Sequence, residues 1–501
     1  VSHVMDSKAI NSLAGQRGFR SFYTDLVADP RAVRVCTGLS CHLAGARCAD
    51  VAGSDPPARA GQCLGYCDRS PARLLPDGQI VLTAGSSAAS IRNIAREAIV
   101  TARIGKGAFA DLERARSVGV YQSLAHALGR TPAEVLAAVE DSGEQGRGGA
   151  GFPTGRKWRL AAESAGTARY VVANGDEGDP GSFIDRVLLE HDPHAILEGM
   201  VLCAFAIGAT AGVVYIRSEY PTAQSRMQTA IQQARAAGLL GAGICGSSFA
   251  FDVQVVAGHG SYVCGEETAL LNAIEGRRGE VRVRPPYPAA QGLFGQPTVV
   301  NNIETLVNIP WIIGRGAAAF RRLGTADSPG TKAFCFNQGF ARPGIVEAEF
   351  GLPLRELIET HGGGGRDGRP LAGIALGGPM GSIVLPGEWD VPLDYRELAR
   401  RGIQSGHGGL VALPADTDWQ ALMVHWLEFM VQESCGKCVP CRLGSAQALA
   451  LARQADTDEA HRKLPALLEL IATTSLCGFG QSLPGPVERL RALALAAGTA
   501  R

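Results

Sequence analysis

The sequence lacks a net charge, since 48 Lys and Arg residues balance 48 Asp and Glu residues in a chain of 501. A chain without a basic or acidic excess has no general electrostatic attraction for nucleic acid or an anionic membrane, so neither is expected as a partner. Aromatic residues are also few, at 6%, whereas glycine is abundant, with 64 residues. This composition is typical of a folded protein with many close backbone approaches, and the length predicts several domains.

A secretory signal pattern is absent from the opening stretch VSHVMDSKAI, because no basic segment precedes an apolar one. We therefore expect a cytoplasmic protein whose 13 cysteines are reduced and serve metal centres or packing rather than disulfides. One uncharged run, 200–216, approaches membrane length, but it is short for a span and glycines divide it. It predicts a buried helix that turns into a buried strand.

Periodicity and turn signals divide the chain into segments of different type. The stretch TPAEVLAAVEDSG opens with a capping box and a proline at the first helical position, which predicts a helix over 131–141. The pair Asp77-Gly78 between apolar runs predicts a β-hairpin. Strand-like runs then alternate with helical segments, an α/β pattern. These runs are RYVVAN, GVVYIR and FDVQVVAG.

Three cysteines near the C-terminus, in ESCGKCVPCRLG, follow a C-x2-C-x2-C spacing. Structural zinc prefers two separated pairs, whereas three overlapping thiols suit three corners of a [4Fe-4S] cube. The compact ferredoxin pattern would place a fourth cysteine where Ser445 stands, so the fourth ligand must come from a distance. The predicted ligands are Cys435, Cys438, Cys441 and Cys477; packing cysteines are the alternative.

Four further cysteines near the N-terminus form two pairs, Cys36 with Cys41 and Cys63 with Cys67. A plant-type [2Fe-2S] loop would need a cysteine at position 44, which is Ala44. Two pairs on facing loops can still hold a [2Fe-2S] cluster, one iron for each pair. A zinc site, or a domain that has lost its metal, remains open as an alternative.

The stretch GRGGAG, residues 146–151, satisfies the pattern G-x-G-x-x-G. It follows the predicted helix rather than a strand, which disfavours a Rossmann dinucleotide loop. A glycine run still lets backbone N–H groups reach a phosphate or a flat ring, and Arg147 and Lys157 add positive charge. A flexible loop without a ligand is the alternative.

Two acidic clusters follow predicted strands: NGDEGD, residues 174–179, and GEET, residues 265–268. Hydrogen-bond acceptors at the carboxyl ends of strands in an α/β fold usually meet the polar groups of a ligand. No histidine lies close in sequence, so ribityl or ribose hydroxyls suit these clusters as well as a metal ion does. Downstream, Tyr287 can stack on a ring, and Asn301, Asn302 and Thr305 can bond a polar ring edge.

Five motifs in this order resemble one family of proteins closely: GRGGAGFPTGRKW, NGDEGDPGSFIDR, GSYVCGEETALLNAIEG, RPPYPAAQGLFGQPTVVNNIETL and ESCGKCVPCRLG. They resemble the flavoprotein subunit of respiratory complex I and its relatives, the diaphorase subunit of NAD-linked [NiFe] hydrogenase and the beta subunit of molybdenum-containing, NAD-dependent formate dehydrogenase. VRVCTGLSCHLAGA and CLGYCDRSPARLL are similar to the thioredoxin-like [2Fe-2S] subunit of the same complexes, with a shortened interval between the cysteine pairs.

This resemblance implies a site for FMN and NAD(H). The residues implied for FMN are Gly146, Arg147, Gly148, Gly149, Gly151, Lys157, Asn174, Asp176, Glu177, Tyr262, Gly265, Glu266, Glu267, Asn301, Asn302 and Thr305. The residues implied for NAD(H) are Phe152, Asp179, Glu267, Arg284 and Tyr287. Glu266 and Glu267 are the implied catalytic pair. The family commonly has Glu, Lys and Phe where this chain has Asp179, Arg284 and Tyr287.

The resemblance also implies a multidomain α/β and α+β architecture. The expected parts are an extension over 1–30, a shortened thioredoxin-like domain over 31–85, a helical linker over 86–130, a Rossmann-like FMN/NAD domain over 131–328, a ubiquitin-like β-grasp domain over 329–415 and a helical bundle with the [4Fe-4S] cluster over 416–501.

The implied function is exchange of hydride between NAD(H) and FMN, and of single electrons between FMN and iron–sulfur clusters. The trimmed N-terminal fusion fits best a formate dehydrogenase beta subunit, which has a molybdenum and iron–sulfur alpha subunit and a small thioredoxin-like [2Fe-2S] gamma subunit as partners. A hydrogenase diaphorase subunit or a complex I flavoprotein is the alternative, and a passive electron-transfer or scaffold subunit is an alternative of another class.

Overall fold

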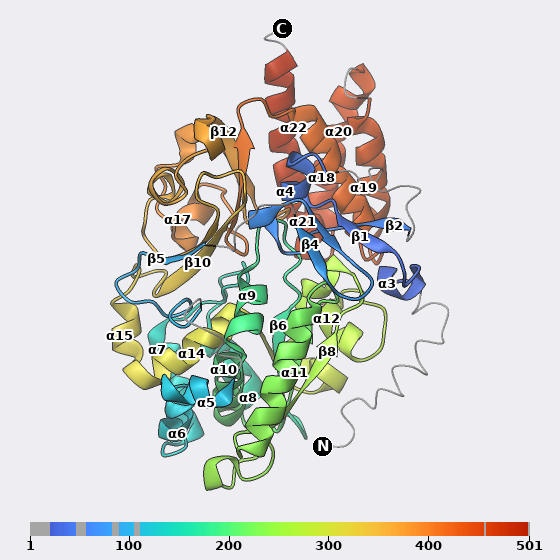
Figure 1. Cartoon of the computed structure of the whole chain (residues 1–501). Coiled ribbons are helices and arrows are strands. Elements are labelled where there is room, and N and C mark those ends of the chain that lie inside the picture. The colour runs from blue at the N-terminus through green and yellow to red at the C-terminus, as the bar shows by residue number, and fades with distance from the viewer. Residues whose placement is uncertain (1–20, 47–56, 83–89, 105–110, 455–456, 499–501) are drawn as a thin grey trace.

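The computed structural model describes residues 21–46, 57–82, 90–104, 111–454 and 457–498. Within them the chain forms two four-stranded sheets, one six-stranded sheet and a C-terminal group of helices, which Figure 1 shows packed around one another. The expected extension over 1–30 is described only from Ser21 onward, where α3 (Thr24–Val27) is preceded by the fully buried Tyr23.

A four-stranded parallel sheet with the order β8-β7-β6-β9 forms the centre of the α/β region. The strands are β6 (Tyr170–Gly175), β7 (Ala211–Ile216), β8 (Asp252–Ala257) and β9 (Thr298–Asn302). The first three confirm the strands predicted from RYVVAN, GVVYIR and FDVQVVAG. Strands β7 and β8 lie on one side of β6 and β9 lies on the other, which makes the boundary between β6 and β9 a topological switch point.

Helices cover this sheet and link its strands. They are α5 (Leu112–Ser117), α6 (Gln122–Ala127), α7 (Pro132–Ser142), α8 (Thr154–Glu163), α9 (Ile184–His191), α10 (Pro193–Ile207), α11 (Pro221–Ala236), α12 (Glu267–Ile274), α13 (Pro288–Gln291), α14 (Ile303–Arg315) and α15 (Ala317–Arg321). The predicted capping box is present, since the Thr131 side chain accepts from the Glu134 N–H and Glu134 bonds the Thr131 N–H in return. The run 200–216 is the buried end of α10 followed by β7, as predicted. Among the described residues, no helix is long and apolar enough to cross a membrane.

The six-stranded sheet has the order β13-β12-β14-β10-β11-β5. Its strands are β5 (Ser90–Asn93), β10 (Thr331–Phe336), β11 (Gly344–Glu349), β12 (Leu371–Leu376), β13 (Ser382–Val384) and β14 (Gly409–Pro414), with α16 (Leu354–Glu356) and α17 (Tyr395–Arg400) beside them. The predicted helical linker over 86–130 is wrong at its start, because β5 pairs in parallel with β11. An exposed edge of β11 was available, and pairing with it satisfies the backbone groups of both segments.

A smaller sheet near the N-terminus has the order β2-β1-β3-β4. It consists of β1 (Val33–Cys36), β2 (Ala58–Gly61), β3 (Ala72–Leu74) and β4 (Ile80–Leu82), with α4 (Leu39–Leu43) after β1. The hairpin predicted at Asp77-Gly78 joins β3 to β4, and Gly78 has a φ of 87°, a value that glycine adopts at little cost.

The C-terminal helices are α18 (Trp419–Glu433), α19 (Val439–Ala452), α20 (Asp458–Thr474), α21 (Gly478–Ser482) and α22 (Pro484–Gly498). Figure 1 shows the N-terminal sheet, in blue, lying between these helices, in red, and the α/β region, in green. Specific bonds hold this arrangement: Arg186 of α9 donates to the Gly65 carbonyl at 3.0 Å, and Gln62 donates to Gln432 of α18 at 2.6 Å.

Candidate functional site

The predicted polar residues meet at the carboxyl ends of β6 and β9. Asn174 is the penultimate residue of β6, and β9 ends with Asn301 and Asn302. Two helices begin at this edge: the Glu266 carboxylate accepts the first N–H groups of α12, and the Asn302 side chain accepts the Thr305 N–H of α14. Helix N-termini carry partial positive charge, so this crevice suits an anionic ligand.

The glycine loop GRGGAG lies against the start of α14. The N–H of Arg147 donates to Thr305 Oγ1 at 2.9 Å, and a Cβ at Gly148 would lie 3.1 Å from the Asn302 Cβ. Gly149 has a φ of 118° and Gly151 one of 59°. Glycine is therefore required both for the backbone conformation and for the close approach, as expected for a loop that lines a ligand crevice.

The Arg147 side chain does not add positive charge to this crevice, contrary to the sequence-based expectation. It is fully buried, where it pairs with Glu144 at 2.6 Å, donates to the Pro329 carbonyl at 2.9 Å and lies 4.8 Å from the centre of the Phe350 ring. The buried Glu144 carboxylate beneath the loop is stabilised by a cation, and Arg147 provides that charge. The residue thus fixes the loop from below, and its backbone N–H is bound to Thr305.

Charged side chains of both signs border the crevice. Lys157 Nζ donates to the Val300 carbonyl at 3.0 Å and lies 3.4 Å from Glu267 Oε2. Arg284 lies 3.5 Å from Glu267 and 3.6 Å from Glu266. The four side chains are partly exposed, so they are available to a bound ligand.

Two buried carboxylate oxygens in this region have no hydrogen-bond partner, Asp176 Oδ2 and Glu266 Oε1. Burial raises the pKa of Asp176 well above its usual value. A Cβ on Gly265 would lie 3.5 Å from Asp176 Oδ2, so glycine leaves room beside this oxygen. A buried acceptor that lacks a donor, beside a glycine that leaves space, suits the hydroxyl groups of a ribityl or ribose chain.

Glu177, which the resemblance implied for FMN, caps α9. Its carboxylate accepts from the N–H groups of Asp185 and Arg186 at 3.0 and 2.9 Å and from the Ser182 hydroxyl at 2.9 Å. These three bonds use both oxygens of a side chain with no solvent exposure. Its role is to hold the strand-to-helix turn that carries Asp176.

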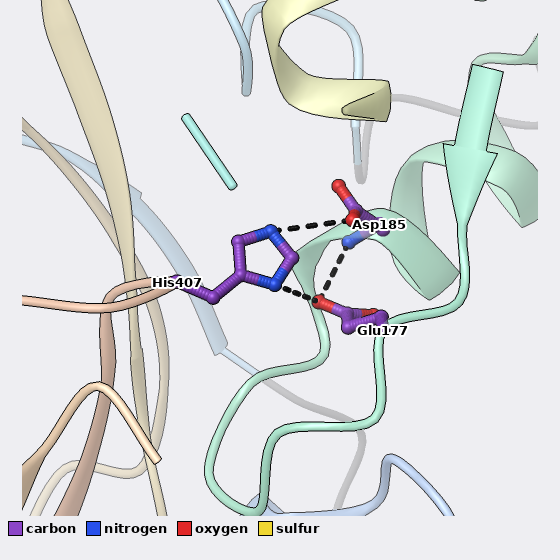
Figure 2. A group of neighbouring side chains, drawn as sticks. All are labelled: Glu177, Asp185 and His407. Atoms are coloured by element: carbon purple, nitrogen blue, oxygen red, sulfur yellow. Dashed lines mark hydrogen bonds and ion pairs between the residues drawn. The ribbon is translucent and has the colours of Figure 1, made fainter. Parts of the chain in front are cut away.

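Two residues that sequence reasoning missed, Asp185 and His407, lie beside Glu177 (Figure 2). His407 lies in the turn before β14, and its Nε2 is 3.2 Å from Asp185 Oδ2 while its Nδ1 is 3.9 Å from Glu177 Oε1. Each carboxylate thus faces a different nitrogen of the imidazole ring. A single metal ion can bind only one nitrogen of an imidazole, so this arrangement is less suited to a metal site than to hydrogen bonding. The only signal in the sequence was a histidine within the glycine-rich stretch SGHGG.

The predicted nucleotide residues are divided between the rim and the interior. Phe152 and Tyr287 expose 40% and 58% of their surface, as a stacking platform requires. Arg284 lies over the Tyr287 ring at 6.0 Å. Asp179 instead accepts from the Tyr262 hydroxyl at 2.5 Å, so it is bound inside the crevice wall.

The four predicted [4Fe-4S] ligands come together at one end of the helical bundle. Cys435, Cys441 and Cys477 are buried in the same apolar cluster, and Cys438 packs against it. Cys438 immediately precedes α19 and Cys477 precedes α21, which places N–H groups of both helices beside the thiols. Burial raises the pKa of Cys441 to about 12 and that of Cys477 to about 11, and an iron cluster would offset this by binding the thiolates.

The four N-terminal cysteines are also gathered in one place. Cys36, Cys41, Cys63 and Cys67 are each at most 2% exposed, and the sulfurs of Cys63 and Cys67 lie 3.3 Å apart. The N–H of Gly181, in the loop that follows Asp176 and Asp179, donates to the Cys67 sulfur at 3.3 Å. The N-terminal thiols therefore lie directly against a wall of the crevice.

Neither thiol set contains three described sulfurs that all lie as close together as the ligands of one zinc ion. Two sulfurs bound to one zinc ion at about 2.3 Å lie within about 4.6 Å of each other. Among the residues that the structure describes, the only group of three or more ligand atoms mutually within 4.8 Å is Glu177, Asp185 and His407. An iron–sulfur cluster binds different thiolates to different irons, so its ligand sulfurs need not all lie mutually this close.

Comparison with protein families matches two regions of the chain. Residues 139–311 match the Nuo51 FMN-binding domain, and residues 421–492 match the NADH-ubiquinone oxidoreductase-F iron-sulfur binding region. These regions contain the crevice and the C-terminal cysteines, respectively.

Comparison with individual proteins finds relatives of the same kind. The chain is 45% identical over 371 residues to the NADP-reducing hydrogenase protein HndC of Solidesulfovibrio fructosivorans, covering 73% of this chain and 76% of the relative. It is 42% identical over 367 residues to an NADH-quinone oxidoreductase subunit of Rhizobium meliloti, covering 72% and 87%. A crystal structure of NAD+-reducing [NiFe]-hydrogenase superposes with a TM-score of 0.82 at 30% identity, covering 97% of this chain and 89% of that one.

Proposed function

Because the chain belongs to the complex I NADH-binding flavoprotein family (Nuo51), we propose that it is the diaphorase subunit of an NAD-dependent formate dehydrogenase. Its FMN-binding domain and its [4Fe-4S] region are those of the family. The observation that carries the diaphorase role is the convergence of the glycine loop, two helix N-termini and the unpartnered Oδ2 of Asp176 at the switch point of the parallel sheet.

FMN bound in this crevice supplies hydride exchange with NAD(H) and one-electron exchange with iron–sulfur clusters. We assign the backbone of the glycine loop, Asn301 and Asn302 to one side of the flavin, since they border the N-terminus of α14. Asp176, with its free oxygen, binds ribityl hydroxyls. Lys157 supplies the cationic group that Arg147 does not.

The nucleotide is assigned to the exposed rim. Phe152 and Tyr287 offer aromatic faces to the rings of NAD(H), and Arg284 supplies charge for its phosphates. Glu266 and Glu267 orient the reacting rings: Glu266 is held by α12, and Glu267 is held between Lys157 and Arg284. Neither glutamate acts as a nucleophile, because the reaction transfers hydride directly between two rings held parallel.

A packed route leads from the crevice to the [4Fe-4S] site. The Tyr262 ring lies 4.9 Å from the ring of Phe429 and 5.7 Å from that of Phe479. Phe479 follows the ligand Cys477, so crevice and cluster ligands share one apolar core. The residues thereby exclude water and hold the two centres at a fixed separation.

The N-terminal thiols are assigned to a [2Fe-2S] cluster, with one iron for each cysteine pair. Their burial and their contact with the crevice loop through Gly181 support this assignment. The sheet order β2-β1-β3-β4, with β1 and β2 parallel and the others antiparallel, supports a shortened thioredoxin-like domain.

Formate is proposed as the electron source because the interval between Cys41 and Cys63 is shortened, a trimmed form of the thioredoxin-like domain that fits the formate dehydrogenase beta subunit best. The expected partners are a molybdenum and iron–sulfur alpha subunit and a [2Fe-2S] gamma subunit. Hydrogen is the second candidate, favoured by the hydrogenase structure that covers 97% of this chain. If the native complex contains molybdenum and reduces NAD with formate, formate is the electron source. If it contains nickel and reduces NAD with hydrogen, hydrogen is the electron source instead.

The decisive test is anaerobic titration of the purified chain with NADH, followed by visible and EPR spectroscopy together with flavin and iron analysis. The proposal expects bleaching of one bound FMN and a reducible [4Fe-4S] signal, with an added [2Fe-2S] signal from the N-terminal thiols. A colourless zinc protein, or an iron protein that does not respond to NADH, overturns the diaphorase role.

A further inference from the structure

His407 faces two buried carboxylates, one at each of its ring nitrogens (Figure 2). Glu177 and Asp185 have side-chain exposures of 0% and 1%, and that of His407 is 6%. Two carboxylates shut away from water need a compensating positive charge or a proton. The imidazole faces both carboxylates and can supply either a charge or a proton.

The other charged groups around this ring are already engaged or lie further along the crevice wall. Lys332 of β10 forms a buried ion pair with Glu304 of α14. Asp179, on the loop after β6, accepts from Tyr262. Glu177, Lys332, Asp179 and Glu304 all act electrostatically on His407, and the three carboxylates favour its protonated form.

Glu177, Asp185 and His407 are not all ionised near neutral pH. Burial raises the pKa of Glu177 to about 7 and that of Asp185 to about 7, and it lowers the pKa of His407. Near neutral pH the two carboxyls therefore retain part of their protons, and the imidazole resists taking one up. A further negative charge nearby favours uptake of a proton.

The cluster is joined to the crevice through Asn302. The Asn302 amide nitrogen donates to Asp185 Oδ2 at 2.6 Å and lies 3.1 Å from His407 Nε2. The segment before His407 also supports the glycine loop, because a Cβ on Gly149 would lie 3.1 Å from the Gly406 carbonyl carbon. A change of charge in the crevice is thus felt by the imidazole through one intervening side chain.

We propose that His407 takes up a proton from solvent when the flavin in this crevice is reduced, and that the imidazolium formed between Asp185 and Glu177 balances the negative charge of the reduced flavin. This inference rests on the proposed function, because it requires bound FMN. Two electrons and one proton convert FMN to its anionic reduced form, and a second proton binds His407 Nε2, where it faces Asp185 Oδ2. When the flavin is reoxidised by one-electron acceptors, both protons return to solvent; when it transfers hydride to NAD, only the His407 proton does.

The test is spectroelectrochemical titration of the FMN in the fully loaded chain between about pH 6 and about pH 8. For a two-electron couple, each proton taken up changes the midpoint potential by about 30 mV per pH unit. The wild-type chain is expected to show a slope near 60 mV per pH unit. His407→Gln is expected to show about 30 mV, because the imidazole that takes up the second proton is then absent.

Two further variants separate this effect from a change in packing. Asp185→Asn removes the carboxylate that stabilises the imidazolium and is expected to lower the slope in the same way. His194→Gln is the matched control, since His194 is a fully buried histidine of α10 bonded to Tyr121 and Gln233, and it should keep the wild-type slope.

A wild-type slope near 30 mV in a chain that binds FMN and is reduced by NADH overturns the inference and leaves the proposed function intact. A slope in His407→Gln equal to that of the wild type also overturns it. A wild-type chain that binds no FMN overturns the proposed function and the inference together.

Discussion

The ring of Tyr262 packs edge-on against the ring of Phe429, with centroids 4.9 Å apart and planes at 77°. Tyr262 belongs to the wall of the crevice, and Phe429 belongs to α18, which leads into the cysteine loop. This contact fixes the orientation of Tyr262, so that its hydroxyl meets Asp179 on the opposite side. Crevice and cluster site are therefore parts of one packed unit.

Tyr262→Phe is expected to destabilise the protein by about 1–3 kcal/mol, because Asp179 loses a hydrogen-bond donor in a place where burial already raises its pKa. Chemical denaturation at neutral pH measures this loss. Tyr170→Phe, at a partly buried tyrosine at the start of β6, is the comparison and should cost less. Equal stability of wild type and Tyr262→Phe would show that Asp179 does not depend on this hydroxyl.

Glu267→Gln is expected to tighten the binding of NAD and NADH about threefold to tenfold, because a carboxylate that repels the pyrophosphate becomes neutral. Titration calorimetry or fluorescence of the loaded chain gives both Kd values. Glu163→Gln, on the exposed end of α8 with a 3.4 Å ion pair to Arg159, is the control for a loss of charge. Unchanged Kd values would remove Glu267 from the nucleotide site.

Cys477→Ser is expected to abolish the [4Fe-4S] EPR signal and to lower the iron content by about four atoms per chain, while FMN is retained. The distant ligand completes the cluster, and a serine oxygen replaces it poorly. Cys203→Ser is the matched control, since Cys203 is fully buried in α10 and outside both thiol sets. Retention of the full signal in Cys477→Ser would contradict its role as a ligand.

Arg147→Met is expected to lower the free energy of unfolding by about 3–5 kcal/mol, because it leaves Glu144 buried without its cation. The double variant Arg147→Met with Glu144→Gln should recover a large part of this loss, since no charge is then left unpaired. Urea denaturation of the four proteins completes the cycle. If both variants lose only FMN affinity and no stability, the guanidinium binds the ligand after all.

The stability contributed by Glu198 is expected to fall as pH rises from about 5 to about 7. Burial raises the pKa of this carboxyl to about 7 from its ordinary value of 4.5, so the folded state holds a proton that the unfolded state has released across this window. The native chain then loses stability with increasing pH, by about 3 kcal/mol at full extent.

Denaturation of wild type and Glu198→Gln at several pH values checks this sign. Glutamine keeps an acceptor for the Leu124 N–H, which the carboxylate accepts at 2.9 Å, and cannot ionise. The stability difference between the two proteins should shift in favour of Glu198→Gln as pH rises. A difference that is constant from pH 5 to pH 8 would place the pKa of Glu198 outside this range.

The local elements and the family were available from the sequence. The capped helix at Thr131, the three strands and the hairpin at Gly78 follow from residue types within a few positions of one another, and the structure confirms them. The burial of Cys435 and Cys477 in one cluster was also expected from the sequence. Three thiols in a C-x2-C-x2-C motif need a fourth ligand for a [4Fe-4S] cluster, and Cys477 is the one cysteine that follows them.

Other features depended on partners that are distant in the chain. Whether Arg147 faces a ligand or the interior was decided by Glu144 and Pro329, and the pairing of β5 with β11 was decided by an edge formed some 250 residues later. His407 acquires its two carboxylates only when β14 is placed beside the parallel sheet. The sequence by itself determined which elements form and which chemistry they carry, because those depend on short-range patterns. The tertiary structure decided which charges are buried together, because burial is a property of the packed chain.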